Sequence, residues 1–403
     1  MINLETPRKF RAFVNQAHQV AAEMLRPNSR RYDLAEHEYP VELDMLAAMV
    51  DGLGASGTGS GAGAAGVRRT EGSEDSGIKN GSNMSSVLSI MEMCWGDVGL
   101  LLSMPRQGLG NSAIASVASD EQLRRFDGVW AAMAITEPEC GSDSASIRTT
   151  ARRDGDDYII DGEKIFVTAG GRCDAVVVWA TLDKSAGRAA IKSFVVPKDT
   201  PGVTVERLEH KLGIRASDTA TIRFENARVP AANLLGSPEI DAGKGFAGVM
   251  QTFDNTRPLV AAMAVGVARA SLELTRDLLA EAGVEIDYDR PTHLQPAAAS
   301  TYLQLEADWE AAHLLALQAA WMADNGRPNS LEASIAKAKA GRTANDITLR
   351  CVELTGSFGY SEHHLLEKWS RDSKILDIFE GTQQIQQLIV ARRLLGKTSA
   401  ELK

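Results

Sequence analysis

The spacing of apolar residues changes twice along the chain and divides it into three parts. Up to about residue 128, and again from about residue 239, apolar side chains recur every three or four positions, which predicts helices. Between them, short runs rich in valine, isoleucine and threonine are separated by turn residues, which predicts strands. We therefore expect a mainly α-helical protein with a central β-domain: an N-terminal helical domain (1–128), a middle antiparallel β-barrel or sandwich (129–238) and a C-terminal four-helix bundle (239–403).

The same pattern sets the expected limits of individual elements. Three N-terminal stretches have helical spacing, the first ending at Pro27 and the last broken near Gly96: 10–25, 39–50 and 83–104. The C-terminal part predicts four long helices, 246–282, 297–325, 330–357 and 382–396. The β-rich runs lie between residues 156 and 230, and turn pairs such as Asp161-Gly162 are expected to separate many of them.

A glycine-rich segment, 52–82, interrupts the N-terminal helices. It contains overlapping Gly-x-Gly patterns, which also occur in dinucleotide-binding loops. Such a loop follows a strand and opens a helix, whereas this segment follows a helix and runs into polar, low-complexity sequence. We therefore predict a flexible surface loop rather than a nucleotide site.

Composition narrows the classes of function. The 403 residues carry a net charge of −10 and no basic block, which argues against a nucleic-acid partner. The four cysteines, Cys94, Cys140, Cys173 and Cys351, form no CxxC pair, and the histidines form no HxxxH motif, so we expect neither a disulfide framework nor a metal site. Because neither a signal peptide nor an apolar run of membrane-spanning length is evident, we expect a cytoplasmic protein.

Two segments near the predicted sheet could bind an anion or a flat ring. The segment AITEPECGSDSASI (134–147) concentrates glycine and hydroxyl residues, through which backbone N–H groups can approach a ligand, although an ordinary capped turn is the better explanation from the residues alone. The segment GEKIFVTAGGR (162–172) places Thr168 at a strand end before a glycine turn. Its hydroxyl could bond a cofactor, but threonine is also simply common in strands.

A third candidate segment is FDNTRPLVAA (253–262), in the C-terminal part. Asp254 and Arg257 are three residues apart, so their role could be limited to an intrahelical ion pair. A buried Arg257 could instead steer an anionic ligand.

The fourth candidate is KILDIFEGTQQIQQLIVARRLL (374–395), where Glu380 is a single carboxylate between two apolar stretches. Gly381 can end one helix and Thr382 can cap the next, which would leave Glu380 as a last-turn surface residue. Its apolar neighbours could instead bury the carboxylate and raise its pKa, as a general base requires. The residues alone leave both interpretations open.

Together these segments resemble the acyl-CoA dehydrogenase family, the flavoenzymes of fatty-acid β-oxidation, in particular short- and medium-chain members and actinobacterial paralogues. The resemblance extends over about residues 34–396. Six motifs occur in the family's order: ITEPECGSD, IDGEKIFVTAGG, GKGFAGVMQTFDNTRPLVAA, ASIAKAKAG, WSRDSKILDIFEGTQQIQ and LIVARRLL. The resemblance implies the three-part fold expected above and FAD as the cofactor.

The resemblance also implies roles for individual residues. Glu380 matches the catalytic base, which removes the α-proton of an acyl-CoA while the β-hydrogen leaves as hydride to flavin N5, giving a trans-2-enoyl-CoA. The residues that match FAD contacts are Ile135, Thr136, Gly141, Ser142, Phe166, Thr168, Thr382, Gln384 and Arg290. Those that match substrate contacts are Ser142, Asp254, Arg257, Phe379 and Gly381. An electron-transfer flavoprotein is the implied electron acceptor.

The chain departs from the family in the half-site that one subunit lends to its neighbour. Arg290 is followed by Pro-Thr-His-Leu instead of x-x-Phe-Gly, and Glu353 replaces a glutamine, which brings negative charge toward a pyrophosphate. Either a homotetramer or a heterotetramer with a paralogous subunit is therefore expected. The alternatives to a self-sufficient dehydrogenase are a subunit that is catalytic only with such a partner, its non-catalytic scaffold, or a same-fold oxidase or monooxygenase, against which Glu380 counts.

Overall fold

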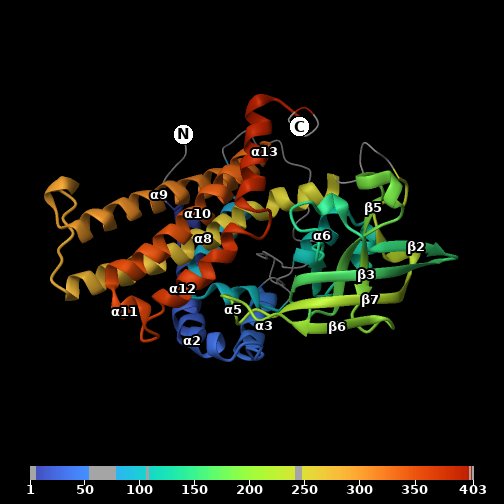
Figure 1. The fold of residues 1–403 in the computed structure, drawn as a ribbon, viewed down its shortest axis with the longest axis horizontal. Helices are drawn as coiled ribbons and strands as arrows, with labels where there is room; N and C mark the ends of the chain where they lie inside the picture. The colour runs from blue at the N-terminus through green and yellow to red at the C-terminus, as the bar shows by residue number, and fades with distance from the viewer. Residues whose placement is uncertain (1–5, 54–78, 106–108, 241–246, 399–400, 402–403) are drawn as a thin grey trace.

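The helices gather at one end of the molecule and the strands at the other (Figure 1), which confirms the predicted fold class. This computed structural model describes residues 6–53, 79–105, 109–240, 247–398 and 401, apart from the side chains of 49–53 and 247–255. Most of the predicted loop 52–82 lies outside the described residues. Helix α3 (Glu42–Leu53) runs up to this gap, and α4 (Ser82–Gly96) begins beyond it.

The N-terminal helices follow the predicted pattern except at Pro27. A short 3-10 turn (Arg8–Phe10) leads into α1 (Arg11–Val20), and a π-helical turn (Ala21–Leu25) joins α1 to α2 (Arg26–Leu34). The prediction that Pro27 ends the helix is wrong. Pro27 lies in the first turn of α2, directly after the wider π turn, where the altered bonding pattern accommodates a residue that lacks an N–H.

A break separates α4 from α5 (Val98–Leu102) beside Gly96, as predicted. Asp97 has an extended backbone, and its carboxylate caps α5 by accepting a backbone N–H of the first turn (2.7 Å). Two more short helices, α6 (Leu109–Val117) and α7 (Asp120–Arg125), lead into the sheet.

Among the described residues, eight strands form one sheet. They are β1 (Ala131–Ala134), β2 (Thr150–Asp154), β3 (Asp157–Thr168), β4 (Ala175–Thr181), β5 (Ile191–Pro197), β6 (Val203–Leu208), β7 (Thr219–Pro230) and β8 (Leu234–Leu235). Their order is β6-β7-β3-β2-β4-β5-β8, and β1 pairs with β4. Neighbours are antiparallel as expected, apart from the parallel pairings of β1 with β4 and of β2 with β4.

The prediction of a turn at Asp161-Gly162 is wrong, because β3 continues through both residues. The pairing of β3 with β7 shifts register between Ile160 and Gly162, which marks a β-bulge. Glycine is required there, since its φ is +151° and a Cβ would lie 2.4 Å from Oγ1 of Thr149. In this strand the pair therefore marks a bulge rather than an end.

The four long C-terminal helices are present as predicted: α8 (Ala247–Glu281), α9 (Ala297–Asp324), α10 (Ser330–Thr355) and α13 (Gln383–Leu395). Two shorter helices, α11 (Ser357–Tyr360) and α12 (Leu366–Ser373), lie between α10 and α13. Helix α8 is central, because it packs against α4, α9 and α10 and contributes to the largest apolar core. Its segment Thr256–Glu281 has the length and hydropathy of a membrane span, but its most apolar window is 72% buried inside the protein, as in a core helix.

A buried charge cluster joins three distant segments. Lys368 in α12 donates to Asp97 (2.6 Å) and to Asp372 (2.5 Å), and all three side chains are almost fully buried. The other oxygen of Asp372 accepts the N–H of Ile214 (2.5 Å), in the connection between β6 and β7. Because each buried charge has an opposite partner, the cluster holds α12 against both the N-terminal helices and the sheet.

Candidate active site

Glu380 lies in the linker between a 3-10 turn (Lys374–Asp377) and α13. Its φ is +55° and that of Gly381 is +87°, so two consecutive residues are left-handed. For glutamate this conformation costs of order 1–3 kcal/mol, which favours a functional reason. Thr382 caps α13 as predicted, since its Oγ1 accepts the N–H of Ile385 (3.4 Å). The last-turn interpretation of Glu380 is wrong, because the preceding turn ends at Asp377.

The Glu380 carboxylate is enclosed by α8 and α10. Thr256 Oγ1 donates a hydrogen bond to Glu380 Oε2 (2.7 Å), and Thr256, Arg257 and Lys337 are all buried. Burial raises the pKa of Glu380, while the Thr256 hydrogen bond and the positive charges of Lys337 and Arg257 act in the opposite direction. The carboxylate therefore combines a raised pKa with a fixed orientation, which are the two properties of a general base.

Two side chains hold the peptide that carries this carboxylate. Lys337 Nζ donates to the Gly381 carbonyl (2.7 Å), and Gln386 Nε2 donates to the carbonyls of Glu380 (3.1 Å) and Gly381 (3.2 Å). Burial lowers the pKa of Lys337 to about 8, against the attraction of Asp377 and Glu380. Within the described part of the chain, the Glu380 N–H has no hydrogen-bond acceptor, so it can donate to a ligand.

Near the sheet, the Glu137 side chain holds the predicted loop 134–147 in place through buried hydrogen bonds. Its buried carboxylate accepts the N–H groups of Arg148 (2.6 Å) and Thr149 (3.0 Å) and a hydrogen bond from Lys164 (2.7 Å). Lys164 also donates to the Ile135 carbonyl (3.0 Å), and burial lowers its pKa to about 8. This ion pair fixes the loop that carries four predicted cofactor residues: Ile135 (buried), Thr136 (partly buried), Gly141 and Ser142 (both exposed).

Phe166 and Thr168 lie at the end of β3. Phe166 is 59% exposed and has a left-handed φ of +55°, and Ala169 shares that conformation with a φ of +61°. Thr168 is partly buried and pairs with Thr219 of β7. Two non-glycine residues at this strand end, Phe166 and Ala169, thus have left-handed backbone conformations. This strain, more than the exposure of the Phe166 ring, indicates a candidate surface for a flat ligand.

Five more predicted residues have no binding role that the structure tests. Phe379 and Gly381 are partly buried, and Phe379 packs against the helical core. Gln384 is exposed on α13, and Arg290 is exposed between α8 and α9. The side chain of Asp254 lies outside the described residues. The roles of all five in binding stay predictions.

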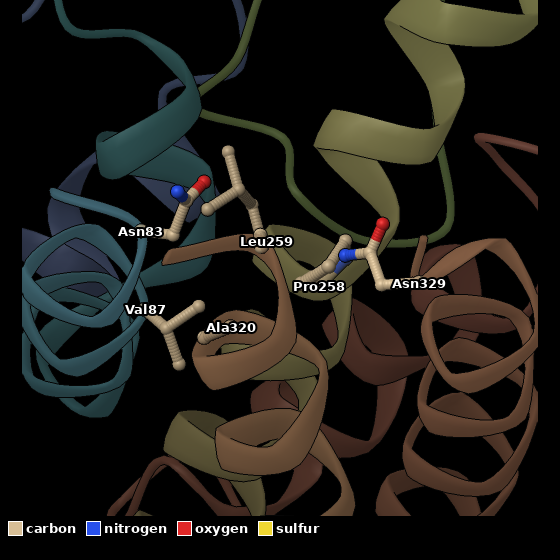
Figure 2. A pocket seen from close by; sticks show the side chains of 7 residues that line it. Asn83, Val87, Pro258, Leu259, Ala320 and Asn329 are labelled. Atoms are coloured by element: carbon tan, nitrogen blue, oxygen red, sulfur yellow. The ribbon is translucent and has the colours of Figure 1, made fainter. Parts of the chain in front are cut away.

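A small, mainly apolar pocket opens beside the same end of α8 (Figure 2). Its walls come from α4, α8, α9 and the turn before α10: Asn83, Val87, Pro258, Leu259, Ala320, Ala323 and Asn329. Pro258 directly follows Arg257, so the pocket and the surroundings of Glu380 share one segment of α8.

Sequence reasoning did not identify Thr256, Lys337 and Gln386 as partners of Glu380. Lys337 could have been recognised from its position in the motif ASIAKAKAG. A lysine among small residues on an otherwise apolar helix face is expected to have a buried partner. Thr256 and Gln386 gave no comparable local signal.

Comparison with known proteins identifies the family. Residues 132–227 match the acyl-CoA dehydrogenase middle domain, and residues 243–395 match the acyl-CoA dehydrogenase C-terminal domain. A probable acyl-CoA dehydrogenase of Bacillus subtilis is 34% identical over 331 residues, which are 80% of this chain and 85% of that protein. A short-chain specific acyl-CoA dehydrogenase of Clostridium acetobutylicum is 32% identical over 330 residues, with the same two coverages. The structure of butyryl-CoA dehydrogenase from Megasphaera elsdenii matches with a TM-score of 0.81 at 29% identity, over 98% of this chain and 100% of that one. The chain is therefore an oxidoreductase that belongs to the acyl-CoA dehydrogenase family.

Proposed function

We propose that the chain is an FAD-dependent dehydrogenase that converts an acyl-CoA thioester into a trans-2-enoyl-CoA, as in the β-oxidation of fatty acids or related acyl chains. One observation carries the proposal: Glu380 is a carboxylate with a raised pKa that Thr256 and a strained junction hold in one orientation. A thioester α-proton is weakly acidic, so its removal needs a base of this kind.

The end of β3 and the loop 134–147 support FAD as the cofactor. Phe166 offers a flat apolar surface, Thr136 and Thr168 offer hydroxyls, and a Cβ added at Gly141 would meet no atom within 4 Å, so a ligand can approach the backbone closely. These groups fit a flavin ring with a polar edge, and the family uses FAD. When bound, FAD supplies the acceptor for the β-hydrogen, which leaves the substrate as hydride.

The other steps belong to residues of the chain itself. The Glu380 carboxylate takes the α-proton, and the electron pair of the broken C–H bond forms the new Cα=Cβ bond as the β-hydrogen departs. The Glu380 N–H donates to the thioester oxygen, where negative charge develops. Because Lys337 and Gln386 fix the neighbouring carbonyls, the N–H and the carboxylate keep one relative orientation. Asp254 and Arg257 are proposed to lie near the CoA and the reacting acyl group.

We propose a short acyl chain as the substrate. Support comes from similar proteins, which include a short-chain specific and a butyryl-CoA dehydrogenase. Butyryl-CoA should therefore have a higher kcat/KM than octanoyl-CoA or palmitoyl-CoA. A preference for palmitoyl-CoA would contradict the chain length but not the reaction.

We propose that a paralogous subunit completes the FAD site in a heterotetramer, with a homotetramer as the alternative. Glu353 is exposed and forms an ion pair with Arg350 (2.5 Å), at a position where the family has glutamine. Phe358 and Tyr360 follow it and are 61% and 81% exposed, an apolar surface that a second subunit would bury. Mass and flavin content of the chain expressed alone test this, and a fully loaded homotetramer contradicts it. An electron-transfer flavoprotein as acceptor and a cytoplasmic location stay predictions.

The test of the reaction is anaerobic mixing with acyl-CoA while the yellow flavin absorbance is followed. Native protein, with its partner if one is needed, should lose that absorbance, and Glu380→Gln should not. Absence of flavin even with a partner would support a scaffold subunit. Flavin that responds to no acyl-CoA would support an oxidase or monooxygenase acting on another substrate.

A further inference from the structure

The fold brings together three potential metal ligands that are far apart in sequence. Glu36 and His37 follow α2, whereas His210 follows β6. One ligand atom from each of the three lies within 4.8 Å of the other two. His210 Nδ1 and Glu36 Oε2 are already 2.7 Å apart, although 174 residues separate them, and the two imidazole rings are 4.9 Å apart. Local motifs cannot reveal this cluster, which is why the sequence predicted no metal site.

His37 provides a second, independent observation. Both of its ring nitrogens are buried, and neither has a hydrogen-bond partner among the described residues. Buried polar atoms nearly always have a partner, so this imidazole lacks one that its position calls for. Its φ is +74°, a left-handed conformation that is uncommon for residues other than glycine and that the surrounding structure must maintain. A left-handed backbone and two unsatisfied ring nitrogens thus occur together in one residue of the cluster.

We propose that Glu36, His37 and His210 form a binding site for a divalent transition metal, with Zn²⁺ as the expected ion. Two imidazole nitrogens and one carboxylate oxygen form a ligand set that Zn²⁺ binds at about 2.0–2.2 Å, with a fourth position left for water or another ligand. The ion lies between His210 and Glu36, and it supplies the missing partner of His37. The His210 side chain is 82% exposed, so it can turn toward the ion and leave a path for its entry.

Two positively charged side chains near the cluster form hydrogen bonds or ion pairs with groups outside it. The Lys211 ammonium donates to the carbonyls of Ser217 (2.9 Å) and Glu209 (3.4 Å). The Arg172 guanidinium lies 3.8 Å from the Asp218 carboxylate. The other oxygen of Glu36 accepts the Lys211 N–H (2.9 Å), which holds the carboxylate in place for the ion.

The site would join two separate parts of the fold. One side is the turn that ends the N-terminal helices α1 and α2, and the other is the connection between β6 and β7. A bound ion therefore acts as a clip between the helical part and the sheet. It is independent of the proposed dehydrogenation, because among the described residues no hydrogen bond or ion pair joins Glu36, His37 or His210 to Glu380 or to the end of β3.

The test uses the full chain stripped with a chelator and dialysed into metal-free buffer. Calorimetric titration with Zn²⁺ should show one ion per chain, and Zn²⁺ should raise Tm. Co²⁺ in place of Zn²⁺ should give the visible absorption of a four-coordinate nitrogen and oxygen site. No binding, or binding of several weak ions without a rise in Tm, would overturn the proposal.

Three variants locate the site. His210→Gln, Glu36→Gln and His37→Gly should each weaken Zn²⁺ binding by roughly tenfold or more and abolish the rise in Tm. His37→Gly also relieves the left-handed strain, so in chelator it should be at least as stable as the native chain. His293→Gln, which removes an exposed histidine outside the cluster, is the control and should bind like the native chain. Equal loss in the control, or no loss in His210→Gln, would place the ion elsewhere and refute the assignment.

Discussion

Replacing Thr256 by valine tests whether one hydroxyl sets the pKa of Glu380. In the native chain, Thr256 Oγ1 donates to Glu380 Oε2 over 2.7 Å in a partly buried setting. A hydrogen bond to a charged group contributes about 1.5–3 kcal/mol, and one pKa unit corresponds to about 1.4 kcal/mol. Valine cannot donate, so the ionised carboxylate loses more stabilisation than the protonated one, whose carbonyl oxygen accepts a weaker hydrogen bond. We expect the pKa of Glu380 to rise by about one to two units.

The pH dependence of kcat/KM for flavin reduction by an acyl-CoA reports this pKa in the free enzyme. A general base must be ionised, so activity increases as the pH rises through its pKa. In Thr256→Val the rising limb should move to higher pH by about one to two units. Below the native midpoint, activity should therefore fall by roughly tenfold or more. Well above both pKa values the two enzymes should have similar activity.

Two control variants make the result interpretable. Thr256→Ser keeps the donor and should retain the native pH profile, whereas Glu380→Gln has no base and sets the background rate. The reasoning is refuted if Thr256→Val has the native profile while both controls behave as stated. The hydroxyl would then not control the base, and burial and the two cations would have to set its pKa alone.

Three further predictions concern the framework of the site. Lys368→Met leaves two buried carboxylates without their cation, so urea unfolding should show a loss of about 3–5 kcal/mol; a loss below about 1 kcal/mol would contradict the buried-pair argument. Gly341→Ala places a Cβ 2.6 Å from the Leu376 carbonyl oxygen, so it should lower Tm by the equivalent of about 1–3 kcal/mol and reduce kcat, because the turn before Glu380 must move. Asp324→Ala removes the acceptor of three backbone N–H groups at the start of α4 (2.6, 2.9 and 3.0 Å), so hydrogen exchange should increase in that turn and stability should fall by about 1–2 kcal/mol.

The long C-terminal helices were predictable because their signals are local. Apolar spacing persists over many turns in α9 and α10, with Pro296 before the first and the left-handed Gly356 after the second. The same residue types misled the prediction at Pro27 and Gly162. Proline is tolerated in the first turn of a helix, and glycine is tolerated in a β-bulge. Residue type alone therefore does not show whether a helix or strand ends at such a residue.

The chemistry of the candidate site was less predictable than its position. Glu380 stood out because apolar residues surround it in sequence. Its hydrogen-bond partner, Thr256, lies 124 residues earlier. Glu36 and His210 are 174 residues apart and gave no local signal at all. Such contacts depend on tertiary packing, which the spacing of residues in the sequence does not describe. The sequence therefore indicates the candidate carboxylate, whereas the packed structure is needed to explain its raised pKa.

Helix α10 explains how the strained Glu380 junction is sustained. Lys337 and Gly341 are four residues apart and therefore lie on one face of this helix. Gly341 lets the helix approach the Leu376 carbonyl, before the junction, while Lys337 donates to the Gly381 carbonyl, after it (2.7 Å). One helix face thus fixes both sides of a left-handed glutamate whose conformation costs of order 1–3 kcal/mol. Because this support comes from a different helix, the local sequence Phe-Glu-Gly-Thr taken alone is compatible with a simple helix cap, and the packed structure adds independent support for the base that the family resemblance implies.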